Sequence, residues 1–229
     1  DLIFDDNPKH SLSAYTRFNS SNLEKTAHVH HGYSSSGFAV LTGLSYSDFS
    51  DLRSGKNQIE DYPSFGLRPD FVQTINGVDS IVINPDPFVQ KGTAFSQFDF
   101  FQKWHFSLSD KVTLDLNLQH SNSSDIPRYD NLTERQNGQL RYATWNYGPQ
   151  VRTLVSPKLS WYGDSPLFDK ALLIVSYQNI KEDRISRRFN DPIEEEQNEI
   201  VDVYGATLDF DKRISGSQNL MYGLDYHYN

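Results

Sequence analysis

The fold is decided by residues 111–121, which read KVTLDLNLQHS. Aliphatic side chains occupy every second position from Val112 to Leu118, and Thr, Asp, Asn and Gln occupy the positions between them. Because successive side chains of a β-strand point to opposite faces, this period of two predicts a strand with one apolar and one polar face. A polar group at every position of one face is unusual for a dry sandwich core, so the pattern favours a water-filled interior.

Eight further segments read as β-strands, and most repeat this alternation. The turns between them are too short for a crossover, so we expect nine strands in an antiparallel up-and-down meander. Residues 169–182 are more continuously apolar, so their facing is ambiguous from the sequence. The eight segments are 11–18, 24–33, 37–49, 96–108, 151–161, 169–182, 200–212 and a last strand from Leu220 to Asn229.

The connections between these strands alternate between short and long. Short turns fall at 33–37, 108–111, 163–166 and 214–217, and longer connections fall near 50–92, 122–148 and 183–199. A meander with short turns at one end and long loops at the other is typical of an outer-membrane β-barrel. Within the first long connection, Asn76-Gly77 between β-forming residues predicts a two-residue type I′ hairpin over residues 71–83.

Composition fits a barrel wall better than a soluble core. The 229 residues are only 37% hydrophobic but 14% aromatic, and barrel rims favour aromatic side chains. The net charge of −9 argues against nucleic acid as a partner. The absence of cysteine excludes structural disulfides and thiolate metal sites. No run of eighteen apolar residues predicts a transmembrane helix.

The number of predicted strands points to part of a larger barrel. Bacterial single-chain barrels have even numbers of strands, whereas nine are expected here. A severed edge strand would leave unpaired backbone groups, which a membrane does not tolerate. We therefore expect residues 1–229 to form one partial barrel domain.

Several stretches resemble TonB-dependent outer-membrane receptors of the type found in Bacteroidetes, near the haem and iron-chelate receptor branch. The most specific is residues 123–134, SSDIPRYDNLTE, followed by residues 145–150, WNYGPQ. The early segment 38–53 and the later segment 201–204 are similar as well. The resemblance spans nearly the whole chain and is more specific for the superfamily than for its ligand.

The resemblance implies a fold, a location and a function. The family barrel has twenty-two strands in the bacterial outer membrane, with periplasmic short turns and extracellular long loops. Its N-terminal plug, which couples to the TonB complex, has no counterpart in these residues. We expect a receptor segment that contacts lipid and serves uptake of a scarce nutrient, with an iron chelate or haem favoured and glycans or cobalamin as further options. The alternatives are a passive pore or structural barrel, and a soluble β-rich carbohydrate-binding module.

The best candidates for ligand contact are aromatic and arginine side chains of the second long loop. Tyr and Trp offer broad contact area at low entropic cost, and Arg pairs with carboxylates through two parallel hydrogen bonds. Such a set suits an anionic, flat or chelated ligand. The alternative is that these residues pack the loop or belong to the outer aromatic girdle. The candidates are Arg128, Tyr129, Tyr142, Trp145 and Tyr147.

Other chemistry has weaker support in the sequence. His28 and His30 share one strand face beside His31, but a polar strand face explains them better than a metal site does. No G-x-S-x-G nucleophile elbow accompanies the scattered histidines, and we expect no enzymatic activity. No cofactor is expected either.

The predicted facing of residues 111–121 can be tested by two neighbouring substitutions. Leu116→Arg places a charge on the lipid-facing side and should cost about 2–4 kcal/mol at mid-bilayer depth. Asn117→Arg, on the opposite face, should be far milder. A membrane-insertion assay compares the two variants, and equal tolerance would contradict the assigned faces.

Overall fold

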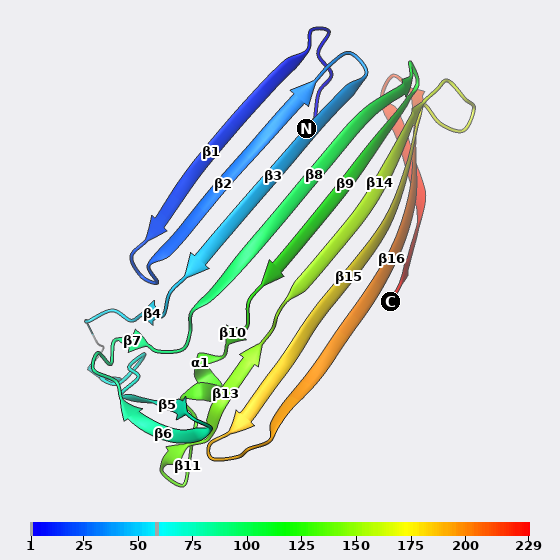
Figure 1. The fold of residues 1–229 in the computed structure, drawn as a ribbon. Helices are drawn as coiled ribbons and strands as arrows, with labels where there is room; N and C mark the ends of the chain where they lie inside the picture. The colour runs from blue at the N-terminus through cyan, green and yellow to red at the C-terminus, as the bar shows by residue number, and fades with distance from the viewer. Residues whose placement is uncertain (1, 58–59) are drawn as a thin grey trace.

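The computed structural model describes residues 2–57 and 60–229, and its main feature is a meander of nine long antiparallel strands (Figure 1). Each strand pairs with the next one along the meander, so the sheet is a single layer that runs from β1 to β17. The predicted all-β meander of nine strands is therefore confirmed. The strands are β1 (Lys9–Asn19), β2 (Glu24–Ser34), β3 (Phe38–Phe49), β8 (Phe95–Ser109), β9 (Val112–Ser123), β14 (Val151–Tyr162), β15 (Lys170–Arg188), β16 (Glu194–Ser215) and β17 (Gln218–Tyr228).

Strand register resolves the ambiguous facing of residues 169–182. Leu173 lies opposite Leu159 on β14 and opposite Leu208 on β16, so it belongs to the apolar face. Leu172 and Ile174 fall on the other face, opposite Ser160 and Lys158 respectively. The continuous apolar run therefore places aliphatic groups on both faces of β15.

One predicted loop is wrong. Residues 183–199 were expected to form a long connection, but β15 and β16 continue through most of it and leave only Phe189–Ile193 between them. Arg187 pairs with Glu194 across the strands, and Arg184 lies 3.2 Å from Glu199. Opposite charges on paired strands stabilise a sheet. Most of the charged residues of 183–199 therefore belong to a long hairpin.

The other two long connections contain small elements of their own. The first holds β4 (Leu52–Arg53), β5 (Asp70–Ile75), β6 (Val78–Ile83) and β7 (Val89–Gln90). The second holds β10 (Ile126–Pro127), α1 (Tyr129–Leu132), β11 (Arg135–Gln136), β12 (Gln139–Leu140) and β13 (Tyr142–Tyr147). β13 pairs with the end of β15 and β10 pairs with β13, which widens the main sheet beyond the meander.

The predicted hairpin at Asn76-Gly77 is confirmed. β5 and β6 pair up to Ile75 and Val78, and both central residues have positive φ, 52° and 77°. That is the geometry of a type I′ turn. A second Asn-Gly turn, Asn137-Gly138 between β11 and β12, has the same signs of φ and escaped the sequence analysis although it carries the same signal.

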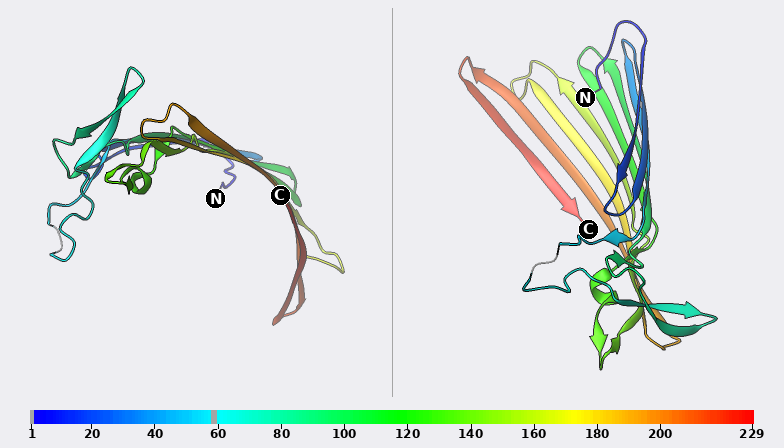
Figure 2. Two further views of the ribbon diagram at one scale, coloured as in Figure 1. Left: turned by 90° about the horizontal axis from the view of Figure 1, so that it is seen from below. Right: turned by 90° about the vertical axis from the view of Figure 1, so that its left-hand side faces the viewer.

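The sheet is bent into an arch, and its polar face is the concave one. Figure 2 (left) shows the N-terminal segment beneath the arch. In that segment the Phe4 ring stacks on the His105 ring with centroids 4.3 Å apart. His105 and Asp115 are paired on the polar face at 2.8 Å, and Lys158 reaches the same carboxylate at 3.0 Å. The convex face therefore carries the aliphatic and aromatic side chains of the alternation.

The described residues contain very little hydrophobic core. The buried apolar side chains are small in number, and no large side chain is fully buried in the described part of the chain. Leu224 on the convex face is 76% exposed. The expectation of an apolar face that is not covered by a second protein layer is met. No helix within residues 2–57 and 60–229 is long and apolar enough to cross a membrane.

Candidate functional site

Three of the five candidate residues meet at the base of the second long loop. Arg128 immediately precedes α1, and Trp145 and Tyr147 lie on β13. The Arg128 guanidinium carbon lies 5.4 Å from the Trp145 ring centre and 4.9 Å from that of Tyr147. The two rings pack edge to face with centroids 5.2 Å apart. These three side chains form the loop cluster.

The positive charge of the loop cluster is already balanced. Arg128 donates two hydrogen bonds to Asp130, at 2.9 and 2.6 Å, and a third from Nη1 to the Tyr147 hydroxyl at 2.6 Å. The paired guanidinium holds the pKa of Asp130 below its usual range. An anionic ligand would therefore have to displace Asp130 before it reached Arg128.

The remaining two candidates lie in separate surroundings. The Tyr129 hydroxyl donates to the backbone oxygen of Leu67 at 3.2 Å, and burial raises the pKa of Tyr129. Tyr142 packs against Arg141, whose guanidinium carbon lies 4.9 Å from the Tyr142 ring centre. Arg141 is itself paired with Glu134 at 2.5 Å. The five candidates are thus divided among three local sets of contacts.

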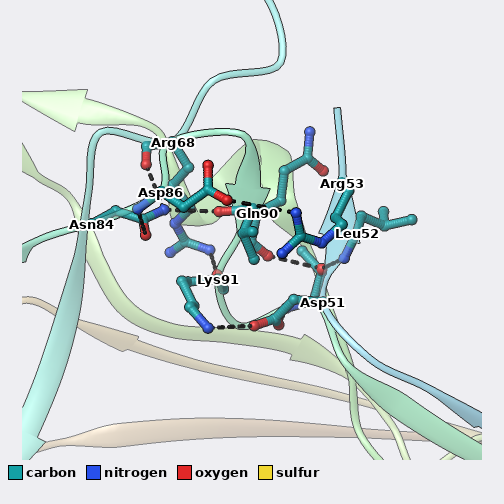
Figure 3. Close-up of polar contacts among 10 residues, drawn as sticks. Asp51, Leu52, Arg53, Arg68, Asn84, Asp86, Gln90 and Lys91 are labelled. Atoms are coloured by element: carbon teal, nitrogen blue, oxygen red, sulfur yellow. Dashed lines mark hydrogen bonds and ion pairs between the residues drawn. The ribbon is translucent and has the colours of Figure 1, made fainter. Parts of the chain in front are cut away.

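The residue after Leu67, which accepts the Tyr129 bond, is a buried arginine of the first long loop, Arg68 (Figure 3). Arg68 is 3% exposed and donates from Nη1 to the backbone oxygen of Lys91. Its Nε has no partner among the described residues, and no carboxylate there forms an ion pair with it. Burial lowers the pKa of Arg68, although Tyr129 and two carboxylates nearby oppose the shift.

Hydrogen bonds and an ion pair near Arg68 connect the two ends of the first long loop. Asn84 donates to the backbone oxygens of Arg68 and Val89, both at 2.8 Å. Lys91 pairs with Asp51 at 3.4 Å, which ties the end of the loop to its beginning (Figure 3). These contacts fix the two ends of the loop relative to each other.

A buried ion pair docks the β5–β6 hairpin onto the end of β15, and the sequence analysis missed it. Arg187 donates to both oxygens of Asp79, at 2.7 and 2.8 Å, and the Asp79 side chain is 1% exposed. Asp79 also accepts from Thr74 at 2.6 Å and from the backbone N–H of Asn190 at 2.9 Å. These bonds, led by that from Arg187, hold the Asp79 pKa far below its usual range. Asp79 and Arg187 are 108 positions apart, so no motif of fixed spacing could have predicted their contact.

A polar groove of about 530 Å³ lies on the concave face just below the loop cluster. It runs across β8, β9, β14 and β15 near their long-loop ends. Its lining includes the apolar residues Phe101 and Ile180, and its polar residues are Gln97, Asp99, Gln119, His120, Ser121, Ser123, Gln150, Arg152, Lys181 and Glu182. This volume lies within the range of small-molecule sites, about 300–1,000 Å³.

Four of the seven histidines form two pairs on opposite faces of β1 and β2. His28 Nε2 lies 3.2 Å from His30 Nδ1, and His10 Nδ1 lies 3.1 Å from His31 Nε2. His28 is also bonded to the Ser45 hydroxyl at 2.7 Å. Within the described ranges, no three His, Asp or Glu side chains converge in a way that would hold a metal ion. Hydrogen bonding between the rings accounts for both pairs.

Searches of family models, of curated proteins and of solved structures found no match to this chain. The family resemblance therefore rests on the sequence stretches alone.

Asp79→Asn should release the hairpin from β15. The substitution leaves the Arg187 charge buried without its anion, which typically costs about 3 kcal/mol or more. Hydrogen exchange of the amides of residues 70–83 at pH 7 should therefore become much faster, while the meander stays protected. The matched control is Asp86→Asn, which removes an exposed contact 3.5 Å from Arg53. Equal exchange in both variants would show that the ion pair does not dock the hairpin.

The hairpin should stay docked in acid well below the usual range of a carboxyl group. Because the folded-state pKa of Asp79 is lowered, its stabilisation is fully present above the unfolded value of about 3.9 and is lost only as pH falls through the lower folded value. Pepsin at pH 3 should leave residues 70–83 intact in the native protein and cleave them in Asp79→Asn. Cleavage of both proteins at this pH would contradict a lowered pKa.

Proposed function

We propose that this chain is part of the wall of an outer-membrane receptor of the TonB-dependent type that imports a scarce nutrient. The support comes from one observation above all, the distribution of side chains on the convex face. That face has aliphatic groups at mid-height and aromatic groups towards both ends of the strands. Outer-membrane barrels present such an apolar band between two aromatic girdles.

The first aromatic girdle lies at the short-turn end. Its rings contact one another across neighbouring strands, with centroid separations of 5.1 Å for Phe38 and Phe106 and 5.0 Å for Phe210 and Tyr222. Trp161 and Phe168 join the same girdle at 5.3 Å. The first aromatic girdle therefore extends from β3 to β17.

The second girdle lies towards the long-loop end. Tyr46 lies opposite Phe98, and Tyr204 packs 5.1 Å from Tyr177 and 6.4 Å from Tyr228. Between the girdles lie residues such as Leu44, Leu116, Leu118, Val155, Leu173, Leu208 and Leu224, which register places on the convex face.

The spacing of the girdles along the strands is close to the height of the apolar band of a membrane. Tyr222 and Tyr228 are six residues apart on β17, which corresponds to about 20 Å at 3.3 Å per residue. Phe38 and Tyr46 are eight residues apart on β3, which corresponds to about 26 Å. The apolar band of outer-membrane barrels is about 25 Å tall. Measured along the strands, the two lengths bracket that height, and a strand tilt of about 35–45° reduces them to roughly 15–20 Å along the membrane normal.

The polar face and the loops favour a receptor over a plain structural barrel. Charged and amide side chains line the concave face, which in a closed barrel would border the lumen. The long loops are tied down by the Asp79–Arg187 pair, the loop cluster and the contacts around Arg68. Ordered loops above a polar groove are suited to ligand binding. Coupling to TonB and the choice of haem or an iron chelate as cargo stay predictions from the resemblance.

Lipid contact of the convex face tests this proposal. Leu208 and Asp209 are neighbours on opposite faces of β16, so a fluorescent label attached to Leu208→Cys should be quenched by brominated lipid chains. The same label on Asp209→Cys should respond instead to a water-soluble quencher. The full chain in its native membrane is the sample. Equal response of the two sites, or recovery of the protein without detergent, would favour a soluble β-rich module.

Energy dependence separates the receptor from a passive pore. Uptake through a TonB-coupled receptor stops when an uncoupler removes the proton-motive force, whereas diffusion through a pore continues. Cells that lack the gene should fail to grow on the imported nutrient at low concentration. Growth that survives the uncoupler and depends on the gene would identify a pore.

A further inference from the structure

We infer that the polar groove on the concave face binds a neutral, hydroxyl-rich ligand, of the chemical class of an oligosaccharide. The inference rests on the proposed function in one respect, because it takes the concave face to be open to the ligand from the long-loop side. It favours a neutral cargo over haem and anionic iron chelates.

The groove offers hydrogen-bond acceptors that the described chain leaves free. Asp99 Oδ1 accepts from Gln97 at 2.9 Å and from the Ser121 hydroxyl at 2.7 Å, and no described residue donates to Asp99 Oδ2. Glu182 Oε2 accepts from Gln150 at 2.7 Å, and Oε1 of that carboxylate has no described donor. The bonds already formed fix both carboxylates in place, so their free oxygens are oriented in advance for a ligand.

A free donor and an apolar surface complete the set. Arg152 donates from Nε to Gln178 at 2.8 Å, which leaves its Nη1 without a described partner. Phe101 and Ile180 are the apolar lining residues that register places on the concave face, and the Lys103 ammonium lies 5.4 Å from the Phe101 ring centre. A sugar ring has hydroxyls that both donate and accept and a C–H face that packs on an aromatic ring, so it can use all of these groups at once.

The balance of charge selects against anions. Asp99 and Glu182 each lack an ion pair with any described cation, and Arg152 is the lining cation that register places on their face of the sheet. Lys181 also touches the groove but is paired with Asp183 at 3.3 Å. An anionic ligand would therefore meet two carboxylates and one guanidinium, and its own charge would be repelled. A ligand rich in O–H donors has no such cost.

The groove lies directly below the loop cluster. Gly148 follows Tyr147 and donates its backbone N–H to the Asp183 oxygen at 2.8 Å, next to Glu182. At Gly148, φ is +134° and a Cβ would lie 2.7 Å from the Asp125 Cα, so this crossing requires glycine. The tight crossing holds the Trp145 and Tyr147 rings at the long-loop side of the groove. A ligand that enters from the loops would thus meet aromatic surface before the carboxylates.

The test is binding of the purified full chain in detergent micelles to a microarray of neutral and anionic oligosaccharides, with haemin and ferric citrate titrated in parallel. We expect binding to neutral glycans and none to haemin or ferric citrate. Asp99→Asn and Phe101→Ala should each weaken the neutral interaction about tenfold, since a charged hydrogen bond and an aromatic contact are each worth roughly 1–2 kcal/mol. Asp99→Asn is nearly isosteric, which guards against a folding defect.

The matched control is Asp225→Asn on the same concave face of β17, outside the groove. It should leave glycan binding unchanged. Absence of binding to every neutral glycan, or binding of haemin or ferric citrate that Asp99→Asn strengthens, would overturn the inference. Either result, together with lipid quenching at Leu208→Cys, would leave the membrane proposal standing. Loss of quenching at that position would instead remove the proposed function itself.

Discussion

The constraint on which the structure depends is that one face of a nine-stranded sheet is apolar and no second protein layer covers it in the described residues. Each strand of the meander pairs with its neighbours, so only the outermost strands leave an edge without a partner strand in the described residues. What remains is the convex surface, where Leu12 and Leu224 are more than two-thirds exposed. Burying apolar surface stabilises a protein by about 25 cal/mol per Å², so an apolar covering would stabilise this face, and the proposed function assigns that covering to a bilayer.

The sequence predicted the parts of the fold that depend on local periodicity. Most of the nine strands follow from the alternation of apolar and polar residues, and the β5–β6 turn follows from Asn76-Gly77. Residues 183–199 were predicted to be a connection, but β15 and β16 continue through most of them. Arg187 and Glu194 stabilise each other only when two strands are already paired, and a single segment read alone does not contain that information.

The candidate site shows the same limit more sharply. Arg128, Trp145 and Tyr147 were found from residue type, and the structure brings these three together while it places Tyr129 and Tyr142 elsewhere. What residue type did not reveal is the partner of Arg128, because Asp130 neutralises it only through the geometry of α1. The Asp79–Arg187 pair was hidden for a related reason, since 108 residues separate its members.

The long loops and the groove on the concave face differ in how their charged groups are paired. The positive groups of the long loops are mostly paired with carboxylates, as with Arg128 and Arg187. They would therefore attract an added anion only weakly. On the concave face the reverse holds, because Asp99 and Glu182 keep oxygens without described partners. In a chain whose net charge is −9, these carboxylate oxygens are hydrogen-bond acceptors that a ligand can use. Selectivity for a neutral, donor-rich molecule follows from that excess of acceptors, because an anion would gain few hydrogen bonds there and would add a third negative charge.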